Sequence, residues 1–239
     1  MITVRPGEDV FEIIIDNPQH ANAVSDEMAA DLIHALEEAG RAARIAVLRG
    51  EGEDFCTGRM SMGKRPAERP EALARRRQTA VIFDCYDAFR RTPIPIIGVV
   101  KGRAHGFGCA IAALCDITIA ADTASFRIPE MAHNILPTMV MSAMVDRLSP
   151  KVLSYLVYST VEIGAEEALR YGLASKVVPE AALDQELAAL TAAMLKAPQP
   201  ALGGVKDYVR SAYDMPIRGA VDFAQNLHAT VNSSSEMKR

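Results

Sequence analysis

The sequence predicts an α/β protein with a helical C-terminal region, and three observations support this. Apolar, β-branched runs at residues 10–16, 45–50 and 96–100 are typical of buried strands, and each is followed by a polar or glycine-rich turn. Helical patterns follow these turns, and from residue 139 onward they predominate. A chain of 239 residues with 49% hydrophobic content can bury a substantial core, as one large domain or two small ones.

The composition argues against several classes of partner. A net charge of −4 provides no basic field for nucleic acid or an anionic membrane, and 5% aromatic residues leave little for base stacking. The first residues lack the apolar core of a signal peptide, and no apolar run reaches the ~20 residues of a membrane helix. We therefore expect a cytoplasmic protein that binds neither nucleic acid nor membrane.

The four cysteines, at positions 56, 85, 109 and 115, form no C-x-x-C pair, and no histidine stands at zinc-ligand spacing. Three of them lie in apolar stretches. We expect reduced, buried cysteines and no metal site.

The first unit is a strand over residues 10–16, a polar turn over residues 17–23 and a helix capped by Ser25. Acidic residues directly after the cap suit the positive end of the helix dipole. Gly40 predicts the end of this helix.

The second unit begins with the strand at residues 45–50. Residues 51–60 follow as an irregular stretch in which backbone N–H groups can point into a cavity. Residues 71–91 contain no glycine or proline and predict a helix. Within it, the three arginines at 75–77 favour a solvated face over a phosphate clamp.

The third unit places three glycines, Gly102, Gly106 and Gly108, between the strand at 96–100 and a buried helix at 109–115. The first N–H groups of a helix have no partners within it, so such a turn can bind an anion. The spacing is neither G-x-G-x-x-G nor that of a phosphate loop, so a nucleotide site is disfavoured. A tight turn that only permits close packing stays open as the alternative.

Beyond a strand at residues 116–120, Glu130 follows a proline and precedes apolar residues. A carboxylate there can be desolvated, which raises its pKa and suits a proton carrier; the alternative is a surface glutamate after a turn. A helix over 164–173, a strand over 176–178 and three amphipathic helices complete the chain. These helices, at residues 181–196, 202–213 and 217–231, pack a core or a neighbouring subunit.

Several stretches match, in order and spacing, the motifs of one family. They resemble the enoyl-CoA hydratase/isomerase (crotonase) superfamily, and together they are far more specific than any single motif. The matching residues are 17–18 with 22–23, 55–58, 102–116, 126–130 and 165–178.

The resemblance implies a spiral of ββα repeats over residues 1–180 and a helical trimerisation region over residues 181–239. It implies a homotrimer or hexamer that takes an acyl-CoA substrate, with coenzyme A as part of the substrate, no separate cofactor and no metal. The family binds the thioester carbonyl with two backbone N–H groups, which stabilise the charge on an enolate oxygen. By position these groups belong to Arg59 and Phe107, whose side chains can vary because only main-chain atoms act.

The resemblance also assigns catalysis and substrate contacts. Glu130 matches the second of two glutamates in the family's hydratases, whereas the first matches Ala110, which can neither hold nor activate water. One carboxylate is enough for proton transfer, so several reactions stay open: isomerisation or hydration of an enoyl-CoA, and hydratase-lyase or decarboxylase chemistry on another acyl-CoA. The missing carboxylate at Ala110 also leaves open a non-catalytic binding protein. His105 and His133 could assist or could simply pack. The substrate contacts are Ala21, Ala23, Gly58, Met60, Ser61, Met62, Gly106 and Gly108.

Overall fold

The computed structural model describes residues 1–60 and 71–237, and Ser61 and Met62 lie outside them. The strands form a six-stranded sheet in the order β1-β2-β3-β4-β6-β9 and a three-stranded sheet in the order β5-β7-β8. The strands are β1 (Ile2–Pro6), β2 (Val10–Ile15), β3 (Ile45–Gly50), β4 (Ile96–Val100), β5 (Arg103–His105), β6 (Ile117–Ala121), β7 (Ser125–Arg127), β8 (Glu162–Gly164) and β9 (Lys176–Val178).

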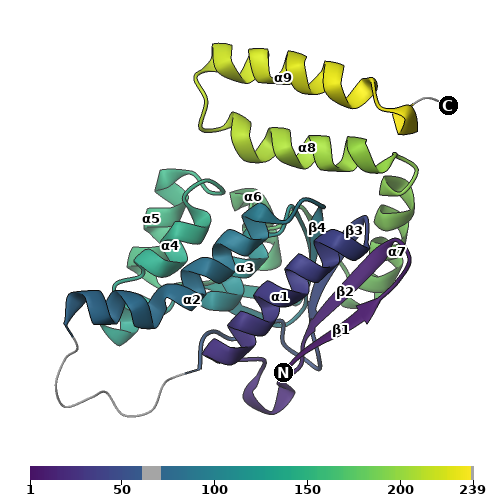
Figure 1. The fold of residues 1–239 in the computed structure, drawn as a ribbon. Helices are drawn as coiled ribbons and strands as arrows, with labels where there is room; N and C mark the ends of the chain where they lie inside the picture. Colours follow the sequence, from purple (N-terminus) through teal and green to yellow (C-terminus); the bar gives the residue numbers. More distant parts are fainter. Residues whose placement is uncertain (61–70, 238–239) are drawn as a thin grey trace.

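Helices connect and cover these strands, so the predicted α/β class is confirmed. Helices α1 and α2 lie side by side in front of the larger sheet, with α3 beside α2 (Figure 1). The helices are α1 (Asp26–Ala42), α2 (Ala72–Arg91), α3 (Phe107–Leu114), α4 (Thr138–Met144), α5 (Pro150–Ser159), α6 (Ala165–Tyr171), α7 (Leu183–Met194), α8 (Gln199–Ala212) and α9 (Ile217–Asn232). Short 3-10 turns lie at η1 (Pro18–His20), η2 (Glu130–His133), η3 (Glu180–Ala182) and η4 (Ser235–Met237).

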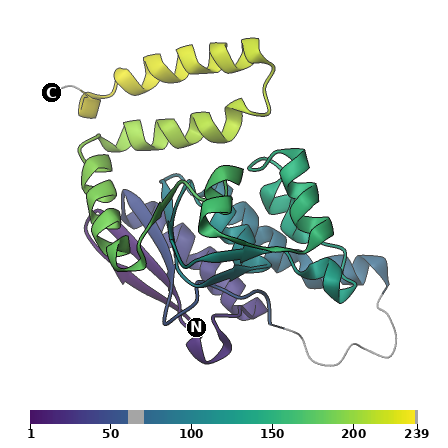
Figure 2. The same cartoon turned by 180° about the vertical axis from the view of Figure 1, so that it is seen from behind.

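The larger sheet is parallel except at one edge, where β1 pairs antiparallel with β2. Strand β4 is buried along its whole length, which explains its continuous apolar sequence. The view from behind shows the smaller sheet beside the larger one (Figure 2). Strand β5 follows β4 after two residues, so the chain turns from one sheet into the other at the glycine-rich turn.

Several predicted helix boundaries were wrong, among them boundaries of α1, α3, α6, α7 and α8. Helix α1 continues past Gly40 to Ala42, because a glycine is needed there for packing: a Cβ at Gly40 would lie 2.8 Å from Cδ of Pro93. Helix α3 begins at Phe107, two residues before the predicted start. Helix α8 begins at Gln199 rather than at residue 202, since a proline is tolerated in the first turn of a helix.

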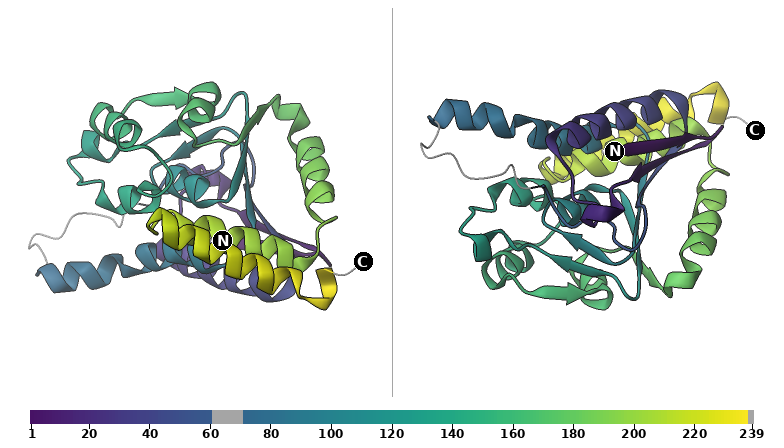
Figure 3. Two further views of the ribbon diagram at one scale, coloured as in Figure 1. Left: turned by 90° about the horizontal axis from the view of Figure 1, so that it is seen from above. Right: turned by 90° about the horizontal axis from the view of Figure 1, so that it is seen from below.

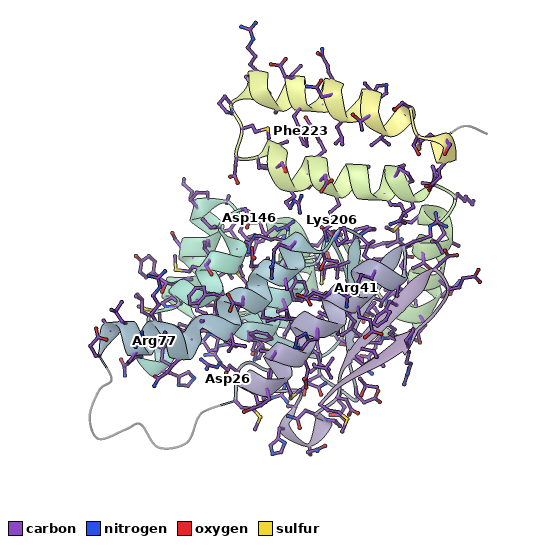
Figure 4. All side chains as sticks on the ribbon, viewed as in Figure 1. Asp26, Arg41, Arg77, Asp146, Lys206 and Phe223 are labelled. Atoms are coloured by element: carbon purple, nitrogen blue, oxygen red, sulfur yellow. The ribbon has the colours of Figure 1, made fainter. Side chains whose placement is uncertain are left out.

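Helices α8 and α9 form an antiparallel pair that lies above the rest of the molecule (Figures 1 and 3). Phe223 of α9 lies between the two helices (Figure 4), and its ring stacks on that of Tyr208 with centroids 5.9 Å apart. Lys206 ties α8 to the body, since its Nζ donates to Oδ2 of Asp116 at 2.8 Å and to the Ile94 carbonyl at 2.9 Å. Helix α7 packs on β6, and the proposed division at residue 180 stays a prediction.

None of the helices in the described part of the chain is long and apolar enough to cross a membrane. The four cysteines are buried and unpaired, as the sequence predicted. The three arginines at 75–77 are exposed, and the helix that carries them is capped by Glu71, whose carboxylate accepts from the N–H of Leu73 at 2.9 Å.

Candidate active site

The two glycine-rich turns lie against each other. Both Gly58 (φ 128°) and Gly106 (φ 52°) have backbone conformations that other residues rarely adopt, and a Cβ on Gly106 would lie 3.9 Å from the Cα of Gly58. A Cβ on Gly108 would overlap the carbonyl of Cys56. The glycines at these positions therefore permit the close approach of two segments that are about 50 residues apart in sequence.

Backbone hydrogen bonds fix this arrangement from both sides. The N–H of His105 donates to the Cys56 carbonyl at 2.9 Å, and the N–H of Val24 donates to the Gly58 carbonyl at 2.9 Å. Among the backbone hydrogen bonds of residues 1–60 and 71–237, none is donated by the N–H of Arg59 or of Phe107. Phe107 is the first residue of α3, where an N–H has no partner within the helix. The two predicted donors are thus free to bind a ligand oxygen.

The polar turn at residues 17–23 supports the first glycine turn. The side-chain amide of Asn22, which is fully buried, donates to the carbonyls of Glu51 at 2.7 Å and Asp54 at 2.6 Å. The carbonyl of Ala21 accepts from Oγ1 of Thr57 at 2.8 Å, and that of Ala23 accepts from Nδ2 of Asn17 at 2.8 Å. The predicted contact residues Ala21 and Ala23 therefore lie beside the site, with their carbonyls already occupied.

Two ion pairs that the sequence analysis missed brace the same turns. Arg103 donates from Nε and Nη2 to the carboxylate of Asp54 at 2.9 and 2.7 Å, and this lowers the pKa of Asp54. Arg59 makes a bidentate pair with Asp26 at 2.7 Å for both bonds. Opposite charges that are 49 and 33 residues apart leave no periodic signal in a sequence.

Glu130 begins the 3-10 turn η2, next to Gly106. A Cβ on Gly106 would lie only 3.0 Å from Oε1 of Glu130, so the carboxyl group lies over the second glycine turn. Its Oε2 is buried and has no hydrogen-bond partner among the described residues. Burial raises the pKa of Glu130, against an opposing backbone hydrogen bond and the charge of His133. The desolvation that the sequence suggested is present, and the catalytic role stays a prediction.

Three further residues singled out in the sequence are Ala110, His105 and Met60, and their surroundings differ. Ala110 is fully buried in α3 and offers no polar side-chain atom. His105 points to the smaller sheet, with Nε2 3.3 Å from Oγ of Ser125 and 3.5 Å from Oε2 of Glu162, and burial lowers its pKa. Met60 lies beside the polar turn, with its sulfur 3.9 Å from Nδ2 of Asn17.

Tyr86 of α2 belongs to the site and was not predicted. Its ring stacks on that of Phe107 with centroids 5.5 Å apart and 27° between the planes. In the sequence, Tyr86 is one apolar position within a long helix, which gives no sign of this contact.

Comparison with known proteins identifies the family. The sequence pattern of the enoyl-CoA hydratase/isomerase family matches residues 5–239. The chain belongs to this family. It is 30% identical over 193 residues to enoyl-CoA hydratase domain-containing protein 3 of Rattus norvegicus, covering 78% of this chain and 62% of that protein. It is 28% identical over 241 residues to the (E)-benzylidenesuccinyl-CoA hydratase of Thauera aromatica, covering 99% of this chain and 93% of that protein.

Solved structures confirm the crotonase fold, with two sheets and C-terminal helices. The enoyl-CoA hydratase of Mycobacterium smegmatis superposes with a TM-score of 0.91 at 25% identity, covering 98% of this chain and 91% of that chain. A Thermobifida fusca protein in complex with CoA superposes with a TM-score of 0.84 at 28% identity, covering 96% and 91%. The Rattus norvegicus relative is longer than this chain, which spans 62% of its length, and the solved Thermobifida fusca structure holds CoA.

Proposed function

We propose that the protein forms a thioester enolate, with the N–H groups of Arg59 and Phe107 as the oxyanion hole and Glu130 as the acid/base. The observation that carries this proposal is the pair of adjoining glycine turns, each of which leaves one backbone N–H free beside the carboxyl of Glu130. Two donors fixed in advance stabilise the charge that develops on the thioester oxygen. In other enzymes, removal of one such donor costs roughly 3–4 kcal/mol in the transition state.

Glu130 fits the proton-transfer step by position and by environment. A general acid/base works best when its pKa lies near the working pH, and burial raises the pKa of this carboxyl toward that range. Taking a proton from the carbon next to the thioester generates the enolate, and returning it to the γ carbon moves the double bond. If the β carbon carries a hydroxyl group, the enolate instead expels it, and it leaves as water with the proton; hydration is the reverse. Asn17, Asn22 and Thr57 hold the first glycine turn and move no proton.

Hydration or dehydration is the reaction that the names of the relatives favour, since those of Thauera aromatica and Rattus norvegicus carry hydratase in their names. Isomerisation is the second candidate, because Ala110 supplies no second carboxylate to hold water. The two candidates share the enolate and differ in whether water adds to the double bond.

One experiment tests the function and separates these candidates. Calorimetry with crotonyl-CoA and acetyl-CoA measures binding, and mass spectrometry in deuterated water follows proton exchange and hydration of crotonyl-CoA together. We expect micromolar binding and exchange of the α or γ protons, with hydration faster than exchange if the enzyme is a hydratase. Absence of binding to both esters at millimolar concentration would contradict the proposal.

We further propose a cytoplasmic homotrimer or hexamer. Apolar side chains of α8 and α9 and of the connection between them are uncovered in the single chain, among them Val205, Tyr213 and Ile217 at 67%, 81% and 81% exposure. Exposed apolar side chains gathered on one part of a surface are typical of a subunit interface.

A further inference from the structure

Tyr86 is a buried polar side chain for which the proposed mechanism has no use. Only 2% of Tyr86 is exposed, and its ring packs on the side chain of Phe107, the residue that supplies one of the two free N–H groups. A phenylalanine would make the same stacking contact. The hydroxyl therefore needs a separate explanation.

The hydroxyl of Tyr86 is fully covered and has no hydrogen-bond partner among the described residues. The Oε2 atom of Glu130 is likewise covered and has no hydrogen-bond partner among the described residues. Such atoms destabilise a fold, and native structures keep few of them unless a ligand or water satisfies them in use.

These two oxygens belong to one region of the molecule. The ring of Tyr86 stacks on that of Phe107, and the carboxyl group of Glu130 lies over Gly106, the residue before Phe107. Burial is the main cause of the raised pKa of Tyr86, and electrostatic interactions with its neighbours, among them Cys85 and Glu130, add to it. Tyr86 therefore packs against the second glycine turn, in the same region as the Glu130 carboxyl.

We propose that Tyr86 determines substrate specificity by holding a hydroxyl group of the acyl chain, or the water that adds to it, together with Oε2 of Glu130. This inference rests on the proposed function. A phenol donates a hydrogen bond and a carboxylate accepts one, whereas a hydroxyl or water can do both, so it satisfies both unpartnered oxygens at once. Tyr86 thus supplies the second polar group of the site, which Ala110 lacks.

The covered carboxyl of Glu130 directly precedes an exposed segment. Residues 131–136 are all exposed, and among them Leu136 is 73% exposed. A ligand enters the proposed site beside this segment rather than through the core.

A pair of unreactive thioesters isolates the hydroxyl contact. Hydroxypivaloyl-CoA carries a hydroxyl on carbon 3 but has no α-proton, so it cannot lose water, and pivaloyl-CoA differs from it only by that hydroxyl. We expect the wild-type protein to bind the hydroxylated ester roughly 2- to 10-fold more tightly, as one neutral hydrogen bond provides. Tyr86→Phe should abolish the difference and leave the melting temperature equal or higher, because no hydrogen bond of the free protein is lost.

Tyr208→Phe is the matched control, since Tyr208 also stacks on a phenylalanine but lies between α8 and α9. It should keep the wild-type preference. Equal binding of both esters by the wild type, a preference that persists in Tyr86→Phe, or failure of that variant to fold would each overturn the inference. Binding of crotonyl-CoA distinguishes failure of this inference from failure of the proposed function. If crotonyl-CoA binds but neither pivaloyl ester does, only the inference fails. If none of the three esters binds, the proposed function fails as well.

Discussion

Asp26 and Arg59 join the start of α1 to the first glycine turn through a bidentate ion pair, with both hydrogen bonds at 2.7 Å. Asp26 lies at the first turn of α1, at the lower end of that helix in Figure 4. The Arg59 and Asp26 side chains are about one quarter and one fifth exposed, so solvent screens the pair only in part. The Arg59 side chain therefore restrains the peptide whose N–H is left free, although only the main chain of this residue was expected to matter.

Asp26→Asn should reduce turnover more than it reduces CoA binding, because it loosens the Arg59 peptide without removing it. Removal of an oxyanion donor costs roughly 10²- to 10³-fold, so a loosened donor should cost about 10-fold in kcat. Steady-state kinetics on crotonyl-CoA measures the effect. Asp146→Asn is the control, since Asp146 forms a similar pair with Arg90 at 2.7 Å beneath α8 (Figure 4). Equal losses of kcat in both variants would show that the Arg59 pair has only a structural role.

Glu130→Gln should lower turnover by roughly 10²- to 10⁴-fold and leave CoA binding near that of the wild type, because it removes the proton carrier and keeps the shape. Glu38→Gln, which changes an exposed carboxyl on α1, serves as the control and should leave turnover and CoA binding unchanged. Rapid hydration of crotonyl-CoA that is undiminished in Glu130→Gln would mean that another group performs the chemistry.

The same variant should change the pH dependence of stability. The folded pKa of Glu130 is raised by burial, so its stabilising contribution is complete below the unfolded pKa of about 4.3 and is lost as the pH rises through the folded pKa. The glutamine of Glu130→Gln stays neutral, so the melting temperature of the variant should rise relative to that of the wild type as the pH increases from about 4 to neutrality. A difference that does not vary with pH would show that the carboxyl is not desolvated in solution.

Ala110→Glu should raise hydration relative to proton exchange, because it restores a second carboxylate near Glu130. The site is fully buried in α3, so the larger side chain should also lower the melting temperature, by an amount that corresponds to roughly 1–3 kcal/mol. Ala110→Gln adds a side chain of nearly the same size without a charge and should leave the ratio unchanged. If both variants shift the ratio alike, packing rather than the carboxylate is responsible.

Lys206→Met should destabilise the protein by about 3 kcal/mol, because it leaves Asp116 and the Ile94 carbonyl without their partner in a buried setting. The ammonium group is largely removed from water, since only 6% of Lys206 is exposed, and this burial lowers its pKa. Chemical denaturation measures the loss, and hydrogen exchange should locate it in α8 and α9. Lys176→Met removes a more exposed ion pair with Glu186 and should cost less than about 1 kcal/mol. Equal losses in the two variants would contradict the anchoring role of Lys206.

Ile217→Asp should weaken self-association, since Ile217 is the first residue of α9 and is 81% exposed in the single chain. Light scattering should give a trimer or hexamer for the wild type and smaller species for the variant. Leu73→Asp changes an apolar residue that is 59% exposed on α2 and should leave the assembly unchanged. A stable wild-type monomer at micromolar concentration would contradict the proposed interface.

The sequence by itself determined the class of the fold and the two glycine turns. These depend on local properties: β-branched runs form buried strands, and glycine permits positive φ at Gly58 and Gly106. The motif order also indicated the family, which the match over residues 5–239 confirmed.

Only the tertiary structure decided which side chains surround the two glycine turns. The pairs of Asp26 with Arg59 and of Asp54 with Arg103 form across long stretches of chain, as does the stacking of Tyr86 on Phe107. The three-stranded sheet was missed for the same reason, because strands of three residues have too little pattern to detect and are held by pairing with distant segments. The edge strand β1 has five residues, ends in Arg5 and Pro6, and is held by its pairing with β2. Contacts of this kind depend on how the parallel strands and their helices stack, and local spacing in the sequence does not specify that stacking.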